Sequence, residues 1–338
     1  MAAPAAYQAL EEAFSSYIGV DYVITTNSGT SALHLAIAGM HYPSGAEIIV
    51  PEFSMIATAL APYYARCTPV FVDCLDDMNM DPEKVREKIT EKTTAIMITH
   101  VYGRICSVQP FLDICEEFNL DLIEDCAEVH GAIYHDGPRS GERVGSLGIG
   151  CFSFYRNKIV AAEEGGAVCI AQDSGFASHL RDLKNMSFGD VHNYVHEHIG
   201  FNYRMPDAEA ALALNSLSQI ESSLAKRKEI ESWYDAFLDE HFVRPQRDVV
   251  WIYDINCKEP EAVVKILNDK GIAARRTFAP MSMQPCLGVK PDVDTLNAYA
   301  LYLSTCYLPV STSMDKADVE TIAAVVNEVA NDSVSTEG

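Results

Sequence analysis

Short apolar runs alternate with amphipathic stretches along the first two-thirds of the chain. The runs are rich in Val, Ile and Leu and are continuous rather than alternating in polarity, which is typical of strands buried on both faces. They occupy residues 21–26, 47–51, 69–73, 94–103 and 121–125. Helical patterns lie between them at residues 27–40, 54–65 and 111–120. This order predicts an α/β fold with a mostly parallel central sheet.

The pattern changes after residue 134. Residues 135–148 are rich in Gly and contain Pro138, which predicts a loop, and two strands follow at 150–157 and 165–171. One long helical pattern then runs from 208 to 238. The remaining segments predict strands at 249–255 and 272–278 and helices at 260–271 and 318–330. We therefore expect a large domain over residues 1–225 and a small C-terminal α+β domain over residues 226–338.

The charge balance narrows the possible partners. Lys and Arg number 25 against 48 Asp and Glu, a net charge of −23, which argues against binding nucleic acid or an anionic membrane. No apolar run approaches the roughly 20 residues that span a bilayer, and the first residues lack a signal-peptide pattern. The ten cysteines form no CxxC pair and are expected as buried thiols in a reducing compartment, which predicts a cytoplasmic protein.

We predict no metal site. His192, His196 and His198 lie close together in the sequence, but no fourth ligand accompanies them.

Three separated features are candidates for chemistry. Residues 27–31 place small polar residues and Gly29 where a strand meets a helix, an arrangement that binds phosphate or merely caps the helix. Asp125 ends a predicted strand, where a carboxylate holds a ligand or caps the next helix. Lys158 lies in an apolar strand–turn–strand segment, where burial would make its amine nucleophilic. The alternative is that its side chain extends to the surface and has no chemical role.

Taken in order, these segments resemble the DegT/DnrJ/EryC1/StrS family of sugar aminotransferases. The resemblance covers roughly residues 8 to 330. It rests on Ser28-Gly29-Thr30, residues 124–128, Ser153-Phe154 with Lys158, residues 164–166 and residues 200–205. It implies the pyridoxal-phosphate (PLP) aminotransferase fold type I, in which helices sandwich a mostly parallel sheet and a small C-terminal α+β domain follows.

The resemblance also implies roles for individual residues. Lys158 and Asp125 are the expected catalytic residues, the first bonded covalently to PLP and the second paired with its ring nitrogen. Met55 takes the position that usually stacks on the ring, and Glu128 lies beside the cofactor. The remaining expected cofactor contacts hold the phosphate: Ser28, Gly29, Thr30, Ser153 and Asn202. Asn202 is expected to do so from the neighbouring subunit, in a homodimer with shared active sites. The expected substrate contacts are Arg204, Arg276, Phe278 and Met281.

The implied reaction transfers an amino group from L-glutamate to a nucleotide-linked keto-sugar. Glu128, residues 157–159 and residues 200–205 most resemble the branch that acts on GDP-4-keto-6-deoxymannose, but Ala279 replaces a histidine of that branch. A dTDP- or UDP-linked keto-sugar is the alternative. A non-catalytic regulator with this fold is a further alternative, which the intact Lys158 and Asp125 disfavour.

Overall fold

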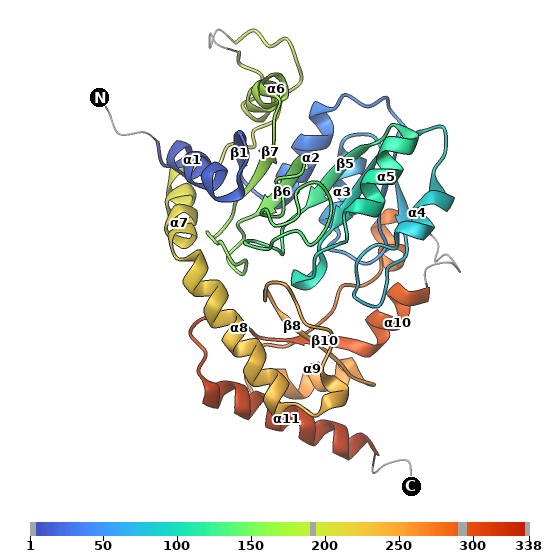
Figure 1. Cartoon of the computed structure of the whole chain (residues 1–338), viewed down its shortest axis with the longest axis vertical. Helices are drawn as coiled ribbons and strands as arrows, with labels where there is room; N and C mark the ends of the chain where they lie inside the picture. The colour runs from blue at the N-terminus through green and yellow to red at the C-terminus, as the bar shows by residue number, and fades with distance from the viewer. Residues whose placement is uncertain (1–4, 190–193, 290–295, 335–338) are drawn as a thin grey trace.

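The computed structural model describes residues 5–189, 194–289 and 296–334. They form two β-sheets, each covered by helices, which lie one above the other in Figure 1.

The larger sheet has seven strands in the order β1-β7-β6-β5-β4-β2-β3. Parallel pairs join β2, β3, β4, β5 and β6, and β7 pairs antiparallel with both of its neighbours, β1 and β6. The predicted mostly parallel sheet is therefore confirmed. The strands are β1 (Tyr22–Thr26), β2 (Glu47–Pro51), β3 (Thr68–Val72), β4 (Thr93–Thr99), β5 (Asp121–Asp125), β6 (Ile149–Ser153) and β7 (Gly166–Ile170).

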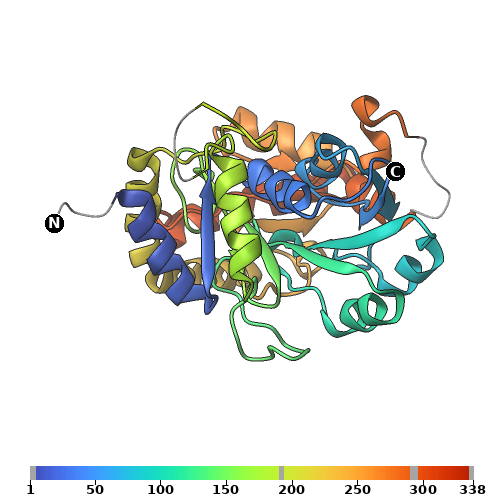
Figure 2. The same ribbon diagram turned by 90° about the horizontal axis from the view of Figure 1, so that it is seen from above.

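Helices cover both faces of this sheet, as the view from above shows (Figure 2). Successive strand residues point into different cores: Ile48 packs with one helical layer and Ile49 with the other. This two-sided burial explains the continuous apolar runs. One layer contains α2 (Gly29–Gly39), α3 (Ala57–Tyr64) and α6 (Ser174–Lys184), and the other contains α1 (Ala6–Ile18), α4 (Pro82–Lys88), α5 (Gln109–Phe118) and α7 (Asp207–Ser218).

The smaller sheet is antiparallel, in the order β8-β10-β9. Its core also includes the second half of α8, so the predicted domain boundary between residues 225 and 226 lies inside that helix. The elements are α8 (Ile220–Phe237), β8 (Tyr253–Asn256), α9 (Pro260–Asp269), β9 (Arg275–Arg276), α10 (Leu296–Ser304), β10 (Thr305–Leu308) and α11 (Lys316–Val334).

Several predicted elements differ from the structure. The strand expected over 94–103 ends at Thr99, and the strand expected over 272–278 is reduced to the two residues of β9. The helix expected over 208–238 is two helices, α7 and α8, which meet at Gln219 (φ −109°, ψ 7°). This break lets α7 pack on α1 while α8 packs on α11. The strand expected over 249–255 begins only at Tyr253, because Val249 and Trp251 pack into the core of the large sheet instead.

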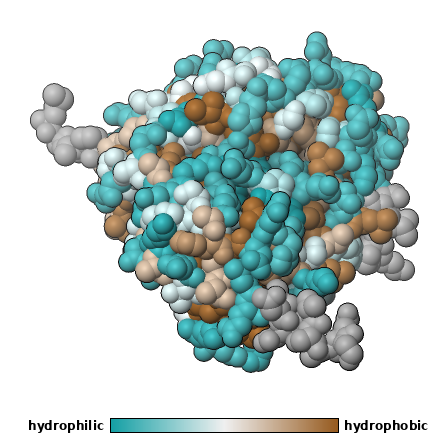
Figure 3. Space-filling model, turned by 60° about the horizontal axis from the view of Figure 1, so that its bottom comes forward, coloured by the Kyte–Doolittle hydropathy of each residue, from teal (hydrophilic) through white to brown (hydrophobic). Residues whose placement is uncertain are grey.

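The surface visible in Figure 3 is largely polar. The face in Figure 3 is mostly hydrophilic, with apolar residues in small separate groups. Among the described helices, none combines the length and apolar character needed to cross a membrane.

Candidate active site

A cavity of about 420 Å³ opens where the parallel strands of the large sheet end. Thr99, Asp125 and Ser153, the last residues of β4, β5 and β6, all line it. Ligands of open α/β sheets bind at this edge. Nine of the predicted site residues line the cavity together: Ser28, Gly29, Thr30, Met55, Asp125, Glu128, Ser153, Lys158 and Phe278.

The N-terminus of α2 forms one end of the cavity. Ser28 caps the helix, since its Oγ accepts a hydrogen bond from the N–H of Ser31 at 3.1 Å. The first N–H groups of a helix have no partner within it and attract an anion. Gly29 is required here, because a Cβ at this position would lie 2.7 Å from the Cβ of Ser153. The helix start and the Ser153 side chain therefore meet without a side chain between them.

Asp125 is a buried carboxylate held in a fixed orientation. Its Oδ1 accepts a hydrogen bond from the N–H of Ala127, and its Oδ2 accepts one from the hydroxyl of Thr58, each at 3.1 Å. Burial raises the pKa of Asp125 in spite of these donors. A cation placed beside this carboxylate would offset that desolvation.

A hydrogen-bonded network of buried side chains lies behind Asp125. The N–H of Cys106 donates to Nδ1 of His100, so His100 donates from Nε2 to Glu124, at 3.2 Å. The hydroxyl of Tyr134 donates to the same carboxylate at 2.7 Å. His100, Glu124 and Cys126 lie close enough to hold a metal ion, but His100 and Glu124 use their ligand atoms in these bonds. The network instead fixes the end of β5, which carries Asp125.

Lys158 lies in the turn between β6 and β7, with only 10% of its side chain exposed. Its Nζ is 3.7 Å from Oε1 of Glu128 and 3.6 Å from the centroid of the Trp251 ring. Burial lowers the pKa of Lys158, although Glu128 and Asp125 oppose the shift. The amine is therefore more nucleophilic than an exposed lysine.

Glu128 faces Lys158 with one oxygen and the main chain with the other. Its Oε2 accepts a hydrogen bond from the N–H of Tyr102 at 2.8 Å. Burial raises the pKa of Glu128, and the charge of Lys158 lowers it in part. Tyr102 lies in the 3₁₀ turn η1 (Val101–Gly103) with φ 51°, a left-handed conformation that is uncommon for a residue with a side chain.

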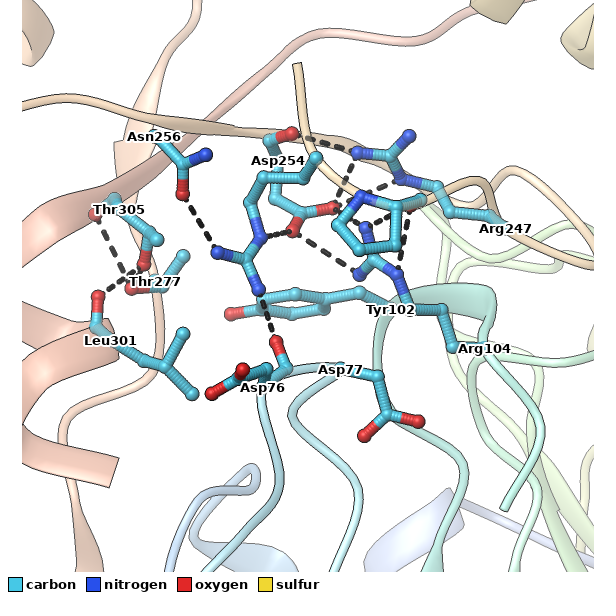
Figure 4. Close-up of polar contacts among 12 residues, drawn as sticks. Asp76, Asp77, Tyr102, Arg104, Arg247, Asp254, Asn256, Thr277, Leu301 and Thr305 are labelled. Carbon is cyan, nitrogen blue, oxygen red and sulfur yellow. Dashed lines mark hydrogen bonds and ion pairs between the residues drawn. The ribbon is translucent and has the colours of Figure 1, made fainter. Parts of the chain in front are cut away.

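The two domains meet next to this turn, around the buried Asp254 on β8 (Figure 4). Three guanidinium groups surround its carboxylate: Arg104 at 3.1 Å, Arg244 at 2.9 Å and Arg247 at 2.9 Å. Burial alone would raise the pKa of Asp254, but the three arginines outweigh it and hold that pKa well below its usual range. Arg104 follows η1 directly, so this cluster ties the small domain to the turn that binds Glu128.

The cavity thus brings together an anion-binding helix start, a fixed carboxylate and a buried amine. The sequence model of the DegT/DnrJ/EryC1/StrS aminotransferase family matches residues 5–327. The chain belongs to this family. It is a PLP-dependent sugar aminotransferase, and its two-domain α/β structure is the aminotransferase fold that the sequence predicted.

Its relatives in the family differ in their substrates. GDP-perosamine synthase from Caulobacter vibrioides is 35% identical, over 94% of this chain and 88% of the relative. dTDP-3-amino-3,6-dideoxy-alpha-D-galactopyranose transaminase from Aneurinibacillus thermoaerophilus is 32% identical, over 94% of this chain and 88% of the relative. The crystal structure of DesV from S. venezuelae, in complex with a ketimine intermediate, superimposes with a TM-score of 0.89 at 27% identity, over 98% of this chain and 90% of DesV.

The cavity of this aminotransferase fits PLP. Its volume admits a phosphorylated pyridine ring, and the anion-binding helix start and Asp125 supply partners for the phosphate and for a protonated ring nitrogen. Lys158 supplies an amine for the carbonyl group. Met55, which is 46% exposed, lies on the cavity wall with its sulfur 3.1 Å from the N–H of Ala57.

Four predicted site residues lie away from this cavity. Asn202 is exposed, and Arg204, also exposed, donates to the side chain of Asn185 at 3.0 Å. Arg276 stacks on the ring of Tyr302 at 4.2 Å and pairs with Glu261. Met281 is buried beside α3.

Sequence reasoning missed several residues of the cavity wall. Tyr155 lies in the strand predicted over 150–157 and Glu164 lies in the motif at 164–166. Arg275 and Tyr307 come from the small sheet, whose position no local pattern reveals. Trp251 could have been singled out from the sequence, because it is one of only two tryptophans in the chain. Among the missed residues of the wall are Thr99, Cys151, Tyr155, Glu164, Trp251, Arg275 and Tyr307.

Of the three histidines considered for metal binding, His192 lies outside the described residues. His196 hydrogen-bonds to the carbonyl of Met186 through Nδ1, at 2.7 Å. The ring of His198 lies 5.8 Å from that of His179.

Proposed function

We propose that this enzyme transfers the amino group of L-glutamate to a nucleotide-linked 4-keto-6-deoxy sugar, with GDP-4-keto-6-deoxymannose as substrate and GDP-perosamine as product. The observation that carries the proposal is the meeting of the Lys158 amine and the Asp125 carboxylate at one cavity. The choice of sugar is supported by the likeness to GDP-perosamine synthase over nearly the whole chain. A dTDP-linked keto-sugar is the second candidate, supported by the relative from Aneurinibacillus thermoaerophilus.

Bound PLP supplies an electron-accepting ring for the carbanion that forms when the amino acid loses its Cα proton. In this proposal Lys158 holds the cofactor covalently and, as a free amine, moves that proton. Its lowered pKa suits both tasks, because a base works best when its pKa lies near the working pH. The surrounding side chains leave only 10% of the Lys158 side chain exposed, which keeps the amine partly dry.

Asp125 holds a proton on the ring nitrogen in this proposal. The donors Ala127 and Thr58 fix its orientation, and a cationic ring nitrogen compensates its burial. Ser28, Gly29, Thr30 and Ser153 bind the phosphate at the start of α2, where the N–H groups and the helix dipole favour negative charge. Met55 packs on the ring through its polarizable sulfur.

The remaining roles involve a second subunit and the substrate. We propose a homodimer in which the exposed Asn202 reaches the phosphate in the partner's active site. Phe278 lies on the cavity wall and contacts the sugar. Arg204, Arg276 and Met281 lie away from the cavity of their own subunit, so we assign them no substrate contact there. All ten cysteines are free thiols, which supports a cytoplasmic location.

A panel of keto-sugars tests the substrate. The purified enzyme is incubated with PLP, L-glutamate and GDP-, dTDP- or UDP-linked keto-sugars, and products are identified by mass spectrometry and NMR. We expect kcat/KM for GDP-4-keto-6-deoxymannose to exceed that for the other sugars at least about tenfold. A site that is complementary to one nucleotide base and one sugar ring binds the transition states of other substrates less well. Preferred amination of a dTDP- or UDP-linked sugar would refute the GDP assignment and leave the aminotransferase activity intact.

Replacement of Glu128 tests whether its side chain acts as a hydrogen-bonding group. Glu128→Gln keeps the acceptor for the N–H of Tyr102 and gains a donor toward the cavity, whereas Glu128→Ala leaves that N–H unpaired and buried. We expect Glu128→Gln to lose less than about fivefold in kcat/KM and Glu128→Ala about fiftyfold or more. Steady-state kinetics measure both values. Equal losses in the two variants would contradict a hydrogen-bonding role.

A further inference from the structure

Trp251 contacts the lysine that the proposed function makes the reacting amine. Its indole face lies 3.6 Å, centroid to Nζ, from Lys158, well inside the roughly 6 Å range of a cation–π contact. The ring is buried, with 6% exposure, and lies on the wall of the cavity. Tryptophan is the aromatic side chain that binds a cation most strongly.

Several contacts hold this ring in place. The indole Nε1 donates to the carbonyl of Asn157, the neighbour of Lys158, at 2.8 Å. Arg227, which is buried on α8, donates to the carbonyls of Val250 and Trp251 at 3.2 and 3.1 Å. The ring is therefore fixed both to the lysine's own turn and to the helix that joins the domains.

We propose that Trp251 is a positioning residue, whose indole face holds the ammonium group that Lys158 forms when it takes up the Cα proton, beside Glu128. The proposal rests on the proposed function, in which the amine of Lys158 is released from the cofactor and later returns to it. An aromatic face attracts the ammonium group but cannot accept its proton. It therefore holds the charged amine near the cofactor without competing for the proton that the amine must transfer.

Several titratable groups share this pocket with Lys158. Burial disfavours its ammonium form, and the carboxylates of Asp125 and Glu128 favour it. His130 is buried next to the same turn, and desolvation lowers its pKa to about 3, so it is neutral at working pH. The other titratable groups of the cavity wall are Cys151, Tyr155, Glu164, Arg275 and Tyr307. The indole ring adds its own attraction for the ammonium form. When the indole ring alone is modified, the other groups of the pocket stay the same, so a change in the pKa of Lys158 reports on the indole.

The two tryptophans of the chain allow a test that alters this attraction and keeps the shape of the side chain. In a Trp233→Phe background, tryptophan analogues with one to four ring fluorines enter only at position 251. Fluorine withdraws charge from the ring face. The pKa of Lys158 is measured in the cofactor-free protein from the pH dependence of its acetylation, by peptide mass spectrometry. We expect it to fall with each added fluorine, by about 0.5 to 1.5 pH units over the series.

Lys226 supplies the internal control. It lies over the ring of Trp233 at 4.2 Å, and that ring is replaced in every protein of the series. Its acetylation profile should therefore not change with fluorination. A Lys158 pKa that stays constant across the series would overturn the proposal.

Substitutions give a second measurement, in the holoenzyme. Trp251→Phe keeps an aromatic face and Trp251→Leu does not, while both lose the hydrogen bond to Asn157. We expect kcat to fall about tenfold further in Trp251→Leu than in Trp251→Phe, with a smaller change in the KM for glutamate. Equal kcat values would count against the proposal. Failure of the proposed function itself would appear separately, as turnover that survives Lys158→Ala.

Discussion

Lys158→Ala is expected to abolish turnover and the visible absorption of the covalently bound cofactor. Among the described lysines, Lys158 is the one that lines the cavity, together with Asp125 and Glu128. Without it, neither covalent attachment nor transfer of the Cα proton has a group to perform it. We expect kcat to fall at least about a thousandfold. Absorbance spectra and single-turnover assays with L-glutamate measure the two effects.

Lys265→Ala is the control for this substitution. Lys265 lies on α9 with 75% of its side chain exposed and pairs with Asp269 on the same helix. That variant should match the unaltered enzyme in absorbance and rate. Retained turnover in Lys158→Ala, with a normal circular dichroism spectrum, would remove Lys158 from the catalytic role.

Asp254→Asn is expected to destabilise the protein by about 3–5 kcal/mol, because it leaves three buried guanidinium groups without their shared carboxylate. Arg247 then keeps its pair with Glu231, whereas Arg104 and Arg244 lose the carboxylate that balances their charge within the domain interface. Urea unfolding at neutral pH measures the loss. Asp269→Asn is the matched control: it removes an exposed carboxylate from a surface pair and should cost less than about 1 kcal/mol.

The same cluster has a defined pH dependence. The folded-state pKa of Asp254 lies below its unfolded value, so its contribution to stability is present above about pH 4 and is lost as the pH falls below that value. The stability difference between the unaltered protein and Asp254→Asn should therefore shrink in acid. A difference that grew below pH 4, or an Asp254→Asn variant as stable as Asp269→Asn, would contradict the role assigned to the arginine cluster.

The large domain could be predicted from the sequence because local patterns of apolar residues encode its strands and helices. Each strand of the parallel sheet is buried on both faces and therefore appears as a continuous apolar run, and Ser28, Asp125 and Ser153 follow or end such runs. Parallel strands bring their carboxyl ends to one edge. The meeting of these residues with Lys158 in one cavity follows from that geometry.

The C-terminal part of the chain supplies residues of the cavity wall that the sequence did not predict. Residues 249–255 have the composition of one strand, yet Val249 and Trp251 pack against the large domain and only residues from Tyr253 join the small sheet. Trp251 therefore reaches Lys158 from nearly a hundred residues further along the chain. Arg275, rather than the predicted Arg276, lines the cavity, because alternate residues of a strand point to opposite faces and no local pattern indicates which face meets the other domain.

The most direct test of the account is to locate the covalent bond to the cofactor. Borohydride reduction of the holoenzyme fixes the pyridoxyl group to its lysine, and peptide mass spectrometry identifies the residue. We predict stoichiometric modification of Lys158 and none of Lys184, the other largely buried lysine of the large domain. A pyridoxyl group on any other lysine, or none at all in an active preparation, would contradict the account.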